Sequence, residues 1–94
     1  MPIVGLLVVE FHLPEARSLK EKRMVLRSVR DRLKKFNIAI AEIEYQDLWQ
    51  RAQLGIVTIG NTTDGVNQVL ETMTHEVDRI QPGSIIRTQI DFLS

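Results

Sequence analysis

Nine of the twelve basic residues of this chain lie in the single stretch RSLKEKRMVLRSVRDRLKK, from Arg17 to Lys35. The same stretch holds two of the twelve acidic residues, so its net charge of +7 is balanced by −7 in the rest of the chain. Guanidinium and ammonium groups at this density are the groups that neutralise phosphates in nucleic-acid-binding proteins. They are also the ordinary solvated surface of a helix. Both interpretations are open until the elements that carry these residues are placed.

A helical projection of this stretch separates its cations from its apolar residues. Ser18 and Glu21 match a capping box, so we expect a helix from there to Phe36 and Asn37. At 100° per residue, its apolar side packs on the rest of the domain, and five cations share an arc of about 80° on another side. These five residues, hereafter the cationic row, are Lys20, Arg23, Arg27, Arg30 and Lys34. The row favours an anionic partner, whereas Asp31 at i+4 from Arg27 favours a solvated face.

Lys22 departs from this separation, because it projects to the centre of the apolar side in the first turn. A lysine placed there must extend past the edge of the sheet or meet a carboxylate. Glu44 and Asp47 are the nearest carboxylates in the topology proposed below.

The remaining elements define the fold class. We expect strands at residues 3–13, 38–46, 51–61 and 85–93, and a second helix that starts at Thr62 to Asp64 and extends to Ile80. The order βαββαβ predicts an α+β, ferredoxin-like fold. Its four-stranded antiparallel sheet would have the order 4-1-3-2, with two helices on one face. A three-stranded βαβ unit plus a hairpin is the main alternative.

Length and composition exclude several classes of protein. Ninety-four residues, 44% of them hydrophobic and 26% charged, predict a single globular domain over residues 1–94. Without cysteine there are no disulfides, thiolate metal sites or cysteine nucleophiles. The apolar run Ile3 to Val9 is too short to span a bilayer. We therefore expect a cytoplasmic protein with no membrane contact.

Helices that cover one sheet face leave the other open to water or to a partner. From the alternation of residue types we expect an apolar half of this open face that suits a homodimer, formed by Val4, Leu6, Ile38, Ile40, Val57 and Ile59. The second-strand residues belong to this face unless a bulge shifts the register of that strand. The charged half contains Glu10, His12, Glu42, Glu44, Arg51 and Arg87. It lies where the start of the basic helix meets the turn QDLWQR. We therefore expect a site at that end, formed by Arg17, Lys22, Glu42, Asp47, Trp49, Gln50 and Arg51.

Metal and hydrolase chemistry are weaker interpretations of these residues. Glu10, His12 and Glu42 have the ligand types of a zinc or manganese site, but Arg51 and Arg87 would pair with the same acids. We predict no metal and no cofactor. Acylphosphatases share this topology and bind phosphate after strand one, where this chain has PEARS, with Arg17 but no glycine-rich cradle. We therefore predict no catalytic residue, and an acylphosphatase-like hydrolase is the last alternative.

Trp49, the single tryptophan, also has two interpretations. It covers the open end of the core, or it is an exposed platform for a base or an anchor for a dimer. Tyr45 and Trp49 do not form the paired aromatics on central strands that an RNA-recognition motif uses.

Two motifs, SLKEKR at Ser18 to Arg23 and AEIEYQDLWQRAQLG at Ala41 to Gly55, follow a strand that ends in HLP. With these motifs the chain resembles the YlxP-like bacterial family, a ferredoxin-like domain of unknown function, over essentially its whole length. Genes of that family often lie beside those for translation initiation and ribosome maturation, which implies a role near RNA or the ribosome. The motif positions are Ser18, Leu19, Lys20, Lys22, Arg23, Glu42, Gln46, Asp47, Leu48, Trp49, Gln50 and Arg51.

These observations together predict a binding protein without catalytic activity that contacts RNA or a ribosomal component through the cationic row. The alternative is a homodimeric protein-interaction module that uses the open sheet face.

Overall fold

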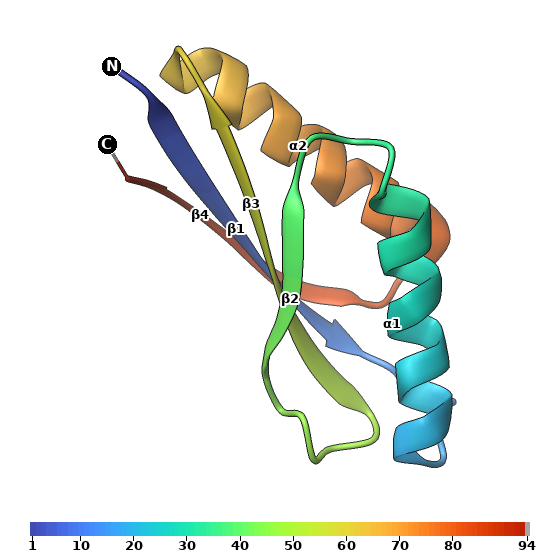
Figure 1. The fold of residues 1–94 in the computed structure, drawn as a ribbon. Coiled ribbons are helices and arrows are strands. Elements are labelled where there is room, and N and C mark those ends of the chain that lie inside the picture. Colours follow the sequence, from blue (N-terminus) through green and yellow to red (C-terminus); the bar gives the residue numbers. More distant parts are fainter. Residues whose placement is uncertain (94) are drawn as a thin grey trace.

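A computed structural model describes residues 1–93, and Ser94 of the predicted domain 1–94 lies outside them. The chain forms β1 (Ile3–His12), α1 (Leu19–Leu33), β2 (Ala39–Glu44), β3 (Arg51–Gly60), α2 (Thr63–Ile80) and β4 (Ile85–Leu93). The four strands make one antiparallel sheet in the order β2-β3-β1-β4, which confirms the predicted ferredoxin-like topology. Both helices lie on the same face of the sheet (Figure 1).

The first helix begins at its predicted cap and ends earlier than predicted. Ser18 Oγ accepts a hydrogen bond from the Glu21 N–H at 3.1 Å, as a capping residue does. The expected end was Phe36 and Asn37, but α1 ends at Leu33. The Phe36 N–H donates to the Leu33 carbonyl at 3.1 Å, a tight i to i−3 contact that turns the chain toward β2.

The core lies between the sheet and the two helices. Leu7, Val9 and Phe11 of β1 are buried there, together with Val66, Leu70, Met73 and Val77 of α2. Gly5 interrupts the apolar alternation of β1 because α2 crosses the strand at that point. A methyl group at Gly5 would overlap the Val66 side chain and lie 2.8 Å from Leu70 Cδ1. The missing side chain thus permits close packing of helix on sheet.

The register of β2 corrects one part of the predicted open face. Residues directly opposite in neighbouring strands share a face, and Ile40 lies opposite Ile56 while Glu42 lies opposite Leu54. Both β3 residues are fully buried beneath the helices, and Ile38 also packs against the core. The placement of Ile38, Ile40 and Glu42 on the open face was therefore wrong.

A β-bulge between Glu42 and Glu44 explains how the alternation misled. The bulge adds one residue, so Glu44 returns to the open face opposite Gln53. Val4 opposite Ile59 and Leu6 opposite Val57 do lie on that face. No helix within residues 1–93 is both long and apolar enough to cross a membrane.

Candidate nucleic-acid interface

The lysine that projects inward from α1 is buried against the loop between β2 and β3, residues 45–50. The Lys22 side chain is 1% exposed, and its Nζ donates to the carbonyls of Tyr45 at 2.6 Å and Arg51 at 3.1 Å. Its Nζ also lies 3.0 Å from Glu42 Oε2, a contact that is an ion pair rather than a hydrogen bond. The partner is thus Glu42 and not Glu44 or Asp47, because the register of β2 places Glu42 on the helix side.

Tyr45 opens this β2–β3 loop in a conformation that a non-glycine residue adopts at a cost. Its φ of 63° lies in the left-handed region. Its carbonyl accepts from Lys22 Nζ and from the Leu48 N–H at 3.0 Å, which closes the turn. Its ring stacks against the Arg51 guanidinium, whose Cζ is 4.3 Å from the ring centroid. These contacts hold the loop in one shape.

Gln50 ties the other end of the loop to the segment that precedes α1. Its Nε2 donates to the carbonyls of Pro14 at 3.1 Å and Ala16 at 3.3 Å. In addition, the Leu13 N–H donates to the Gln50 carbonyl at 2.8 Å. Gln50 thus bonds the second motif to the segment before the first, and Lys22 bonds the two motifs directly. Sequence reasoning anticipated that the motifs meet without identifying these bonds.

Glu10 and Arg51 form an ion pair on the open face, next to the loop. Arg51 Nη2 and Nε donate to Glu10 Oε2 at 2.6 and 3.1 Å. The hydrogen bonds from Arg51 lower the pKa of the Glu10 carboxyl below its ordinary value, against the opposing effect of burial. Glu10 is engaged on one sheet face and Glu42 on the other, so they do not converge on a metal. Within residues 1–93, no three histidine or acidic side chains are grouped to hold a metal ion.

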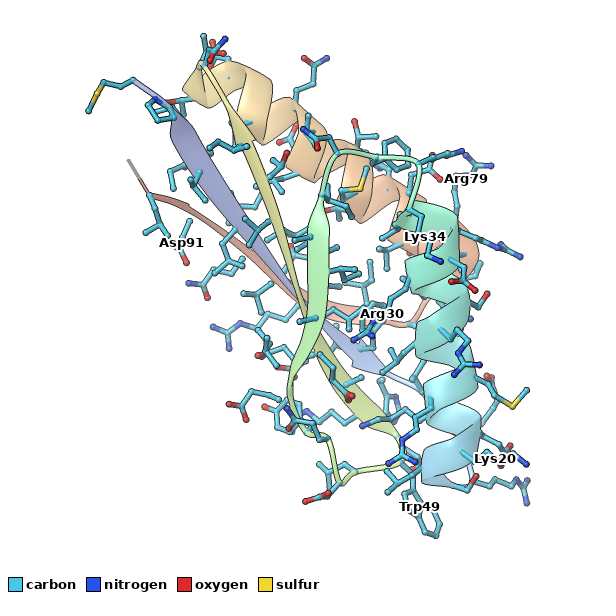
Figure 2. The ribbon with its side chains drawn as sticks, viewed as in Figure 1. Lys20, Arg30, Lys34, Trp49, Arg79 and Asp91 are labelled. Carbon is cyan, nitrogen blue, oxygen red and sulfur yellow. The ribbon has the colours of Figure 1, made fainter. Side chains whose placement is uncertain are left out.

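All five members of the cationic row are exposed. Lys34 Nζ lies 3.5 Å from Asp31 Oδ1; in the part of the chain that the structure describes, the other four have no carboxylate at ion-pair distance. Figure 2 shows Arg30 and Lys34 near the C-terminal end of α1 and Lys20 near its start. The row therefore presents positive charge that the protein itself leaves largely uncompensated.

The row borders a groove, which the helical projection alone did not predict. A hollow of about 420 Å³ between α1 and β2 is lined by Arg23, Leu26, Arg27, Arg30, Asp31, Lys34 and Glu42. Strand β2 is an edge of the sheet, so the groove is open along one side. We call it the α1–β2 groove.

Trp49 does not cover the core, which removes one of its two interpretations. Trp49 is 52% exposed and is not among the side chains packed against the core, and its neighbour Leu48 is exposed as well. Both line a second hollow, of about 590 Å³, with His12, Asp47, Gln50 and Arg51. Figure 2 shows Trp49 at the end of the molecule where Lys20 lies.

The structure places the predicted site residues in two overlapping sets. Lys22, Glu42, Gln50 and Arg51 are engaged in contacts within the chain. Asp47 and Trp49 line the second hollow, together with Gln50 and Arg51. Arg17 is exposed beside the helix cap, where its backbone N–H donates to Glu21 Oε2 at 3.2 Å. Sequence reasoning missed the Tyr45 carbonyl as a partner of Lys22, because a backbone acceptor leaves no signal in residue type.

The fold and this site define a small α+β protein of ferredoxin-like topology with a cation-lined groove beside an edge strand. The chain belongs to the family described as "Protein of unknown function (DUF503)", whose model matches residues 4–90. It is 36% identical over 77 residues to "Uncharacterized protein YlxP" of Bacillus subtilis (strain 168), covering 81% of this chain and 84% of that protein. The resemblance seen in the motifs is confirmed.

Solved structures with the same fold are distant in sequence. The de novo designed protein Foldit4 superimposes with a TM-score of 0.60 at 6% identity, covering 100% of this chain and 98% of that one. The de novo designed protein LFR1 1, described as having a ferredoxin fold, gives a TM-score of 0.51 at 14% identity and covers 99% and 84%. These similarities concern the fold alone.

Proposed function

We propose that the protein is a binding protein for RNA, free or within the ribosome, and that the cationic row on α1 contacts the RNA phosphates. One observation carries this proposal. Along the exposed side of α1, four cations have no carboxylate at ion-pair distance among residues 1–93: Lys20, Arg23, Arg27 and Arg30. Like charges at this spacing repel one another, and that repulsion is relieved when phosphates bind.

The dimensions of the row suit a phosphate backbone. From Lys20 to Lys34 the helix rises about 21 Å at 1.5 Å per residue, which is the length of a few nucleotides. The α1–β2 groove provides a concave surface along which the phosphates can lie. The choice of RNA over DNA follows the gene context of the family, whose genes often lie beside those for translation initiation and ribosome maturation.

A salt-dependent binding titration with structured RNA tests this function. The variant Arg23→Ala/Arg27→Ala/Arg30→Ala should bind more weakly and depend less on salt. Each lost phosphate contact should reduce the slope of log affinity against log salt by about 0.7 to 0.9. A matched control, Arg32→Ala/Lys35→Ala/Arg79→Ala, removes the same charge from another hollow of about 280 Å³. Equal effects of the two variants, or no binding by the parent protein, would contradict the proposal.

A second candidate function is supported by the open sheet face. Ile59 is 56% exposed and Leu93 61%, and Val4 lies opposite both in the neighbouring strands. With Leu6 and Val57 they form a cluster of apolar side chains on a face that no helix covers. An exposed apolar cluster of this kind is suited to a second copy of the chain.

A further inference from the structure

We propose that the hollow beside Trp49 holds an unpaired nucleobase of the RNA, stacked on the indole ring. This inference rests on the proposed function, because the phosphates of the same RNA segment would lie along the cationic row. It assigns the ligand class as single-stranded RNA, or a loop with a base turned out, since a base within a duplex cannot reach an aromatic side chain.

The first support for this inference is the way in which Trp49 is held. Lys22 and Gln50 fix the two ends of the β2–β3 loop through hydrogen bonds to backbone carbonyls, and Tyr45 is kept in its left-handed conformation. The indole is nevertheless half exposed. A large aromatic side chain on a rigid loop loses little conformational freedom on binding, which is the condition for an effective stacking platform.

The second support is the chemistry of the lining. Besides Trp49, the hollow is lined by Leu48, His12, Gln50, Arg51 and one acid, Asp47. The carboxylate of Asp47 repels a phosphate but accepts hydrogen bonds from the amino groups on base edges. Arg51 is already paired with Glu10. The hollow therefore suits a flat, neutral group with polar edges, whereas the neighbouring row suits phosphates.

The third support is position. The first turn of α1 is bonded to the β2–β3 loop through Lys22, so the start of the cationic row and Trp49 belong to one end of the molecule (Figure 2). An RNA strand that follows the row toward its start arrives at the indole. Stacking is tolerant of base identity, so we expect binding without strong sequence preference.

The single tryptophan makes the test direct, because all indole fluorescence comes from Trp49. The full chain is titrated with a short unstructured RNA and with an abasic strand of equal phosphate count, and binding is followed in parallel by anisotropy of a label on the strand. We expect the RNA to quench the indole fluorescence and the abasic strand to bind more weakly without quenching. Trp49→Ala should weaken RNA binding by about 5- to 150-fold while leaving the salt slope unchanged, and Trp49→Phe should retain most of the affinity.

Each alternative gives a different result. If neither strand binds, the proposed function itself fails. A second outcome is that both strands bind equally, that the fluorescence does not change and that Trp49→Ala has the affinity of the parent. In that case the row alone binds RNA, and the base site is overturned. If Trp49→Ala converts a dimer to a monomer in sedimentation without changing RNA affinity, Trp49 is a dimer anchor and the base site is likewise overturned. Ile86→Ala, an exposed apolar change outside the hollow, controls for general effects.

Discussion

Lys22 Nζ lies 2.6 Å from the carbonyl oxygen of Tyr45, so a buried cation in the first turn of α1 holds the left-handed residue that opens the β2–β3 loop. The same ammonium contacts the Arg51 carbonyl at the start of β3 and the Glu42 carboxylate at the end of β2. The two motifs of the chain are therefore joined by the contacts of one buried lysine. Trp49, on the loop that these contacts fix, is exposed to solvent.

Removal of the buried cation should destabilise the fold. Lys22→Met leaves two carbonyls and the Glu42 carboxylate without their partner, and we expect unfolding free energy to fall by about 2–4 kcal/mol. Urea denaturation followed by circular dichroism measures the change. Lys20→Met, an exposed neighbour on the same helix, should change stability by less than about 0.5 kcal/mol. Similar losses in both variants would show that Lys22 stabilises only as any helical lysine does.

The contact between α2 and β1 should be intolerant of a side chain at residue 5. Gly5→Ala places a methyl group against Val66 and Leu70, and we expect a loss of about 1–3 kcal/mol from overpacking. Gly55→Ala is the matched control, because its methyl group would lie 3.4 Å from the Ile43 side chain, an ordinary contact. Thermal unfolding of the two variants compares them, and an unchanged midpoint for Gly5→Ala would contradict the packing described.

The Glu10–Arg51 pair should make stability depend on acid pH. Because Arg51 lowers the pKa of folded Glu10 below the ordinary value of 4.5, Glu10 stabilises the fold above that value. This contribution is lost as the pH falls through the lowered pKa. The stability difference between the parent and Glu10→Gln should therefore shrink below about pH 4.5. Urea midpoints measured across that range test it, with Glu71→Gln on the exposed side of α2 as the control. A difference that is constant with pH would contradict the assignment.

Each residue of the cationic row should contribute separately to the salt dependence of RNA binding. In the RNA titration, Arg27→Ala should lower the salt slope by about 0.7 to 0.9, as expected for one lost phosphate contact. Arg32→Ala removes the same charge from the same helix, outside the row, and should leave the slope unchanged. An equal decrease of the salt slope in both variants would indicate that RNA binding depends only on the net charge of the protein.

The apolar cluster on the open sheet face should control self-association if it is an interface. Ile59→Asp should then shift a dimer to a monomer in sedimentation velocity, since a buried unpaired carboxylate is costly. Ile86→Asp serves as the control, because Ile86 is 55% exposed but lies near the opposite end of the sheet. A parent protein that is monomeric at micromolar concentration would rule out this interface.

The fold and the direction of the side chains on the first helix could be predicted largely from local pattern. Alternating and helical periods placed every element, and the capping signals at Ser18 and Thr62 matched the starts of both helices. The helical projection of Lys22 toward the core was correct for the same reason. These features depend on residues close in the chain, so the order of residue types contains them.

The partners of those side chains depended on tertiary structure. Whether Lys22 meets Glu42 or Glu44 is decided by one extra residue in β2, and a bulge has no reliable mark in residue types. The same bulge turned Ile38 and Ile40 away from the open face. The contacts that fix the β2–β3 loop use the backbone carbonyls of Tyr45 and Arg51. Every residue has a backbone carbonyl, so residue type does not mark these two. Local sequence thus determined where the charges of α1 point, whereas long-range strand register decided which sheet face Glu42 lies on and that Lys22 meets it.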